Sequence, residues 1–168
     1  MKLMSLGAVA LTALLTGCAA SPELVSCLQP NRRVTVEVGG LKERPAKPGA
    51  KRARPQSVMS KADLQGDNAF DYGSAVLKTG AKADLDKLVN TLNKGTRRDK
   101  RPTKVSSVII SGHTDRTEFE DGMTELDEQR ARAVQAYLTQ KGIDQKLMFW
   151  EGKDAKQPVA VTKFCEET

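Results

Sequence analysis

The alternation of short apolar runs with amphipathic helices limits this chain to few folds. Residues Val105–Ser111 form an apolar run, and its centre, Val108–Ile110, is typical of a strand that is buried on both faces. Helices are expected on either side of it, at Thr79–Lys94 and at Asp121–Lys141, because apolar residues recur there on one face and a glycine follows each segment. Such an order needs a sheet with helices packed on it.

Shorter runs are expected to add strands to this core. Ser57–Leu64 precedes the first helix, Leu147–Trp150 follows the second, and Val159–Phe164 is expected to form an edge strand. Upstream, Arg33–Val38 alternates polar and apolar residues and is expected to form a short strand that Gly39-Gly40 ends. The predicted fold class is α/β, an α+β sandwich of βαβαβ order with a mixed sheet and two main helices packed on it.

The first eighteen residues carry an export pattern. Lys2 supplies one positive charge, and the apolar run Leu3–Leu15 is shorter than the roughly 20 residues needed to span a bilayer. A basic start and a short apolar run before small residues are typical of a secretory signal. Leu15–Cys18 then matches the bacterial lipobox, so we expect residues 1–17 to be removed and Cys18 to carry lipid such as palmitate. An ordinary signal peptide with a chance cysteine is the alternative.

The mature chain is expected to begin with a lipid-anchored segment and linker at residues 18–56, followed by one domain at 57–168. Residues 42–54 are rich in Lys, Arg and Pro and have too little apolar surface to fold alone. Extended, the linker would reach over about 100 Å. A solvated spacer and a contact with anionic lipid or wall polymer both fit this composition. The residue after Cys18 is Ala19 and not Asp. By resemblance to other lipoproteins, this favours sorting to the outer membrane, with the domain in the periplasm.

The remaining cysteines and the charge limit the chemistry further. Cys27 and Cys165 can pair in an oxidising compartment, although free thiols or a bond to another chain remain alternatives. Because the chain has one histidine and no CxxC motif, we expect neither a metal site nor a cofactor. The net charge of +6 is moderate, and an exported protein is not expected to bind nucleic acid.

The helix predicted at Asp121–Lys141 carries an arginine on its apolar stripe. Arg130 lies four residues after Leu126 and four before Val134, so it shares their face. A guanidinium in that place needs a partner or a water-filled cleft. Asp115 directly follows the buried strand and is the natural candidate. The two groups would then meet at the sheet edge where α/β folds commonly bind ligands.

These residues also resemble the OmpA-like C-terminal domain family. The resemblance rests on Gly112–Asp115, on Leu126 with Arg130–Val134, and on Phe70–Lys78, which is similar to the family's motif before its first long helix. Order and spacing agree with the family over about Ser57–Val161. Members such as the peptidoglycan-associated lipoproteins bind peptidoglycan without covalent chemistry and are not enzymes. The resemblance implies the same for this chain, which carries no catalytic constellation of its own.

The resemblance assigns roles to the two charged residues. In the family, the corresponding aspartate and arginine hold the free end of meso-diaminopimelate, a zwitterion in the peptidoglycan stem peptide. Asp115 would accept hydrogen bonds from the ammonium, and Arg130 would fork onto the carboxylate. An internal salt bridge between Asp115 and Arg130 is the alternative.

Neighbouring residues of the same motifs receive lesser roles. Phe70 and Asp71 are expected to line the cleft, and Thr114 belongs to the same motif as Asp115. His113 is expected to brace the loop beneath the site, with a ligand contact as the alternative.

The family pattern is broken beside the site. Glu118 occupies the position three residues after Asp115, where the family usually has glycine, and Gly122-Met123 replaces an aromatic–Asn pair. The acidic residues of this loop would repel carboxylates of the stem peptide or redirect Arg116. These departures affect the expected affinity for peptidoglycan and not the fold.

Two functions from different classes fit the sequence. The first is an outer-membrane lipoprotein that binds peptidoglycan through diaminopimelate and so tethers the membrane to the wall. The second is a structural subunit of an envelope-spanning secretion or conjugation complex, whose OmpA-like domain docks proteins of that complex. Retention on purified peptidoglycan separates the two.

Overall fold

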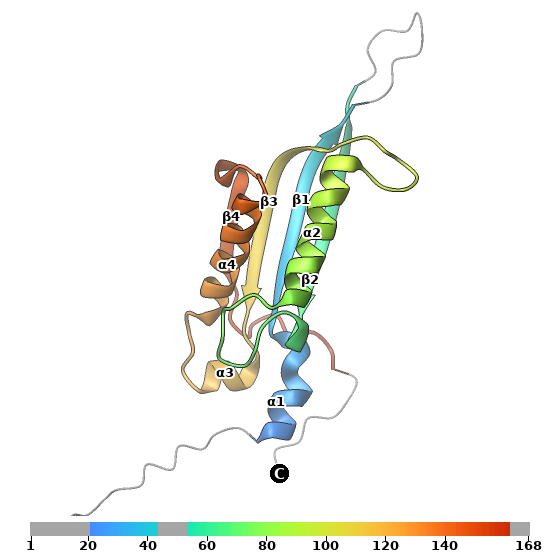
Figure 1. Cartoon of the computed structure of the whole chain (residues 1–168). Coiled ribbons are helices and arrows are strands. Elements are labelled where there is room, and N and C mark those ends of the chain that lie inside the picture. Colours follow the sequence, from blue (N-terminus) through green and yellow to red (C-terminus); the bar gives the residue numbers. More distant parts are fainter. Residues whose placement is uncertain (1–20, 44–53, 162–168) are drawn as a thin grey trace, which may run out of the picture.

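Four strands form one mixed sheet in the computed structural model, which describes residues 21–43 and 54–161 (Figure 1). The strands are β1 (Arg33–Lys42), β2 (Gln56–Gln65), β3 (Lys104–His113) and β4 (Met148–Gly152), in the order β2-β1-β3-β4. β1 is antiparallel to β2 and β3, whereas β3 and β4 are parallel. The predicted α+β fold class with a mixed sheet is confirmed.

Two long helices, α2 (Thr79–Lys94) and α4 (Leu126–Gln140), pack on the same face of this sheet (Figure 1). The helix predicted at Thr79–Lys94 is confirmed at both ends. Two shorter helices, α1 (Pro22–Leu28) and α3 (Arg116–Glu120), lie together at one end of the sheet. The α2–β3 connection and the last residues of β1 lie at the opposite end. Single 3₁₀ turns occupy Gln29–Asn31, Gly66–Asn68 and Gln145–Leu147.

The core lies between the sheet and the two long helices. Alternate residues of β1 point into it, and the apolar stripes of α2 and α4 face them. Fully buried members of this core include Val34, Val36, Phe70, Leu85, Ile110, Val134 and Leu138.

No helix within residues 21–43 and 54–161 covers the other face of the sheet. Ile109 is 41% exposed and Phe149 is 63% exposed, and the two are cross-strand neighbours on that face. The prediction that Val108–Ile110 is buried on both faces is therefore wrong. A short apolar run cannot reveal this, since Val108 and Ile110 alone account for the buried face.

The domain begins earlier than residue 57, where the sequence placed its boundary. β1 lies between β2 and β3, so the segment at 18–56 contributes an inner strand and is not a linker to the domain. Gly39 and Gly40 do not end this strand; its register with β3 shifts between them. A Cβ at Gly40 would lie 2.8 Å from the carbonyl oxygen of Lys104, so close packing explains this glycine. Residues 42–54 connect two paired strands.

The second predicted helix is also shorter than expected. Instead of one helix from Asp121, α3 ends at Glu120 and α4 begins at Leu126, with Gly122 at a φ of +80° between them. The predicted edge strand does not form at Val159–Val161, where the amide of Val159 donates to Asn31 Oδ1 at 2.7 Å. The rest of that prediction, the signal at 1–17, Cys18 and Cys165 lie outside the described residues.

Candidate functional site

The guanidinium of Arg130 is fully buried and holds a carboxylate in a forked arrangement. Its Nη2 lies 2.6 Å from Glu118 Oε1, and its Nη1 lies 2.7 Å from Glu118 Oε2. Both side chains are 0% exposed. Two parallel charge-assisted hydrogen bonds of this kind are the geometry in which arginine binds carboxylates most strongly.

Three backbone carbonyls fix Arg130 in this orientation. Its Nε donates to Ser74 O at 3.0 Å, and its terminal nitrogens donate to Asp71 O and His113 O, each at 3.3 Å. Phe70 packs beneath, with its ring centroid 5.2 Å from the guanidinium carbon. The loop before α2 and the end of β3 therefore preorganise Arg130 to receive a carboxylate.

Glu118 is held as firmly as the arginine that it contacts. Its Oε1 accepts from the amide of Gly73 at 3.0 Å, and its Oε2 accepts from the amide of Asp115 at 3.3 Å. The second contact is half of a capping box at the start of α3, in which Asp115 Oδ1 accepts from the amide of Glu118 at 2.8 Å. The capping box at the start of α3 thus positions the Glu118 carboxylate against Arg130.

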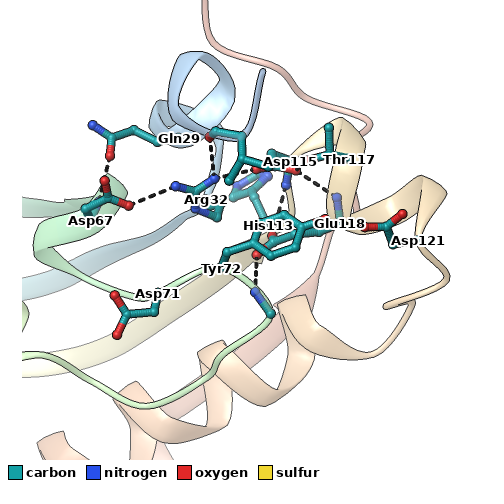
Figure 2. Close-up of polar contacts among 12 residues, drawn as sticks. Gln29, Arg32, Asp67, Asp71, Tyr72, His113, Asp115, Thr117, Glu118 and Asp121 are labelled. Carbon is teal, nitrogen blue, oxygen red and sulfur yellow. Dashed lines mark hydrogen bonds and ion pairs between the residues drawn. The ribbon is translucent and has the colours of Figure 1, made fainter. Parts of the chain in front are cut away.

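Asp115 is paired with an arginine that the sequence analysis did not consider. Arg32, just before β1, places Nη1 at 2.8 Å from Asp115 Oδ2, and both side chains are at most 2% exposed (Figure 2). Asp115 also accepts from Thr117 Oγ1 at 2.6 Å. The guanidinium of Arg32 also donates hydrogen bonds to Asp67 Oδ1 at 2.8 Å and to Val25 O at 2.9 Å.

Tyr72 covers this second ion pair. Its ring lies over the Arg32 guanidinium, with 5.8 Å between the guanidinium carbon and the centroid, and its hydroxyl donates to Asp121 (Figure 2). Burial, followed by the hydrogen bond to Asp121, raises the pKa of Tyr72 to about 12. The phenol is therefore a neutral donor at neutral pH, and it helps to exclude water from Arg32.

The predicted partners Asp115 and Arg130 do not pair with each other. They lie on either side of Glu118, and each has its own internal counter-ion. The prediction that Asp115 compensates Arg130 is wrong, because Glu118 is delivered to Arg130 by the capping box. Their role in binding diaminopimelate stays a prediction.

The other predicted site residues lie around this cluster in different ways. Phe70 is buried against Arg130, whereas the side chain of Asp71 is 69% exposed and pairs with Lys78 at 2.7 Å. Thr114 is buried, and none of the described residues forms a hydrogen bond with its hydroxyl. His113 contributes its carbonyl to Arg130. Cys27, in α1, is disulfide-bonded; its pairing with Cys165 stays a prediction.

Sequence reasoning missed Arg32 and misjudged Glu118. The spacing Asp115-x-x-Glu118 is a capping-box pattern and was visible in the sequence. No comparable pattern marks Arg32, because 83 residues separate it from Asp115.

A model of the OmpA family matches residues 69–167, which is more than half of the chain. This chain belongs to the OmpA family. Outer membrane protein A of Bordetella avium is 30% identical over 113 residues, or 67% of this chain and 54% of that protein. Outer membrane protein A of Shigella flexneri is 32% identical over 62% of this chain and 28% of its own length, and outer membrane protein P5 of Haemophilus influenzae is 28% identical over 64% and 28%.

The chain spans about half, or less, of the length of these curated relatives. Among solved structures, the OmpA-like domain of FopA1 from Francisella tularensis subsp. tularensis SCHU S4 matches with a TM-score of 0.41 and 27% identity, over 51% of this chain and 53% of that one. Within the described residues, no helix is long and apolar enough to cross a membrane, and no cluster of His, Cys, Asp or Glu is arranged to hold a metal ion.

Proposed function

We propose that this OmpA-family chain is an outer-membrane lipoprotein, anchored through Cys18, whose periplasmic domain binds peptidoglycan without catalysis. The observation that carries the proposal is the buried, carbonyl-anchored Arg130, which is preorganised to grip a carboxylate in a fork. A free diaminopimelate end offers a carboxylate and an ammonium on one carbon. Arg130 and Asp115 are the matching charges.

In this chain the binding would proceed by exchange. Glu118 already supplies the carboxylate that Arg130 would take from the ligand, and Arg32 supplies the cation that Asp115 would take. A stem peptide must displace both side chains, so the free energy of the two internal pairs opposes binding. We therefore expect weaker retention on peptidoglycan than for a variant in which Glu118 is replaced by the family's glycine.

The docking of envelope proteins is a second candidate function, favoured by two observations. First, Asp115 and Arg130, which are expected to bind peptidoglycan, already form ion pairs with Arg32 and Glu118 of the same chain. Moreover, two residues lie between Cys18 and Ser21, the N-cap of α1, so the chain from Cys18 to Ser21 extends over about 10 Å at most. A lipid on Cys18 would hold the end with α1 and α3 near the membrane surface, with the ion pairs of Arg32 and Arg130 beside it.

Co-sedimentation with purified peptidoglycan sacculi tests the proposal. The unlipidated mature chain should be retained in part, Glu118→Gly should be retained more strongly, and Arg130→Ala should not be retained. Circular dichroism of each variant checks that it is folded. If neither the wild type nor a folded Glu118→Gly sediments, the domain does not bind the wall, and a docking function is favoured.

The anchor is tested separately. Cells expressing the full chain with labelled palmitate should incorporate the label, and Cys18→Ser should abolish incorporation. Label that persists in Cys18→Ser would contradict the predicted lipidation site.

A further inference from the structure

A second buried cationic site lies on the face of the sheet that no helix covers. Arg33 and His113 are directly opposite each other in the β1–β3 ladder. Because residues alternate along a strand, they share the open face with Thr35 and Ser111. A cavity of about 400 Å³ opens here. Its lining includes Arg33, Ser111, His113, Glu151, Lys153 and Gln157.

The buried guanidinium of Arg33 has no counter-ion among the residues that the structure describes. The residue is 8% exposed, and its hydrogen bond goes to Gln157 O at 2.7 Å, a neutral carbonyl. Among the described residues, no carboxylate oxygen forms an ion pair with it, and burial lowers its pKa despite the field of Asp63. A buried charge of this kind is costly unless an anion compensates it.

The acidic groups around the cavity are already engaged elsewhere. Glu151 accepts from Ser111 Oγ at 2.8 Å and pairs with Lys153 at 2.9 Å. Asp63, which also lines the cavity, accepts from Thr35 Oγ1 at 3.0 Å and lies 3.5 Å from Lys61. The third acidic lining residue, Glu37, lies 3.9 Å from the same lysine. None of these carboxylates is free to turn toward Arg33 without losing its own partners.

His113 lines the same cavity. It is 3% exposed, and its buried Nδ1 has no hydrogen-bond partner among the residues that the structure describes. Burial, and then the charges of Arg33 and Lys153, lower its pKa to about 4, while Glu151 acts in the opposite direction. The imidazole is therefore neutral at neutral pH, so the positive charge at this place is that of Arg33.

We propose that this cavity binds a carboxylate group, held by the guanidinium of Arg33 beside His113. The cavity volume suits a small organic acid or the C-terminal residue of a peptide. The site uses none of the charged pairs around Arg130 and Asp115, so it is independent of the proposed wall contact.

The single histidine makes the test direct. Because His113 is the only histidine of the chain, its imidazole signals in NMR spectra need no assignment. The folded, unlipidated mature chain is titrated with acetate, with N-acetylalanine, and with N-acetylalanine amide as the uncharged control. We expect saturable shifts of the His113 signals and a higher pKa of His113 with both acids, and no response to the amide.

The identity of the stronger ligand distinguishes the two sources of the carboxylate. Tighter binding of N-acetylalanine than of acetate would indicate a peptide end, and equal binding would indicate a small acid. The same chain is also titrated with sulfate at matched ionic strength. An equal response to sulfate would overturn the assignment of a carboxylate site.

Variants locate the site on Arg33. Arg33→Gln should weaken binding of the acid by about tenfold or more, and Arg33→Lys should weaken it less, because the charge remains while the fork is lost. Arg132→Gln, which removes the same charge from an exposed helix position, should bind like the wild type. The absence of any saturable response in the wild type would overturn the proposal, whatever the stability of the variants.

Discussion

Arg32 and Arg33 are neighbours in the sequence, and both are buried, yet their surroundings are opposite. Arg32 contacts two carboxylates, those of Asp67 and Asp115, and lies under the ring of Tyr72. Arg33 points to the open face of the sheet and contacts one neutral carbonyl. The buried charges of Arg32 and Asp115 beside α1 and α3 are therefore paired, whereas the charge of Arg33 on the open face has no counter-ion within the described part of the chain.

The same contrast separates the buried cluster around Glu118 from the open cavity. In the buried cluster, Glu118 and Arg32 pair with Arg130 and Asp115, the two charged residues that the proposed function assigns to a zwitterionic ligand. In the open cavity, no carboxylate among the described residues pairs with Arg33. Burial of a charge alone does not distinguish a structural ion pair from a binding site; the presence or absence of an internal counter-ion does.

The largest expected effect comes from breaking the buried ion pair between Glu118 and Arg130. Glu118→Gln leaves the Arg130 guanidinium buried with neutral partners, so the free energy of unfolding should fall by about 3–5 kcal/mol. Urea denaturation measures this loss. A loss below about 1 kcal/mol would mean that water reaches Arg130.

Replacement of each neighbouring arginine by methionine compares the two regions directly. Arg32→Met leaves the fully buried carboxylate of Asp115 without this counter-ion and should lower the free energy of unfolding by about 3 kcal/mol. Arg33→Met removes a buried charge that has no counter-ion and should change it by at most about 1 kcal/mol in either direction. Equal losses in the two variants would contradict the contrast.

The open cavity should also make stability depend on pH. His113 has a pKa of about 4 in the folded chain and an ordinary value of 6.5, so the unfolded chain binds more protons between these values. Its stabilising effect is present above pH 6.5 and is lost as the pH falls toward 4. Between pH 7 and pH 5 the loss should be about 2 kcal/mol.

The control for that pH effect is His113→Gln. Its free energy of unfolding should decline less than that of the wild type over the same interval, since other groups titrate equally in both. Identical slopes would show that His113 is already accessible to protons in the folded chain.

The smallest effect is expected at a surface pair outside both regions. Lys87 and Asp84 lie 2.7 Å apart on α2, but their side chains are 78% and 48% exposed. Asp84→Asn should therefore cost less than about 0.5 kcal/mol in urea denaturation. A loss comparable to that of Glu118→Gln would mean that burial does not account for the difference.

The sequence predicted those parts of the fold that depend on local patterns. The helix Thr79–Lys94 was predicted to the residue, because its apolar stripe is local and Gly95 ends it at a φ of +75°. The membership of β1 in the sheet was not predicted, because its partners lie in β2 and β3, far along the chain. The Lys-, Arg- and Pro-rich residues that follow β1 suggested a linker, so β1 was not assigned to the domain.

The candidate site was predicted in its residues but not in its pairing. Asp115 and Arg130 do lie in one buried cluster, as the family resemblance implied. Their counter-ions could not be predicted from spacing alone, because Arg32 reaches Asp115 only when the start of β1 meets the end of β3. Glu118 was recognised as a departure from the family, yet its effect on Arg130 depends on where α3 places it.

The carboxylate of Glu118 lies between Arg130 and the amide of Asp115, and calorimetric titration with meso-diaminopimelate tests whether it competes with that ligand. Glu118→Gly, kept folded as judged by circular dichroism, should bind the amino acid at least about tenfold more tightly than the wild type, since no internal carboxylate competes for Arg130. Equal affinities, or tighter binding by the wild type, would show that Glu118 does not compete with the ligand.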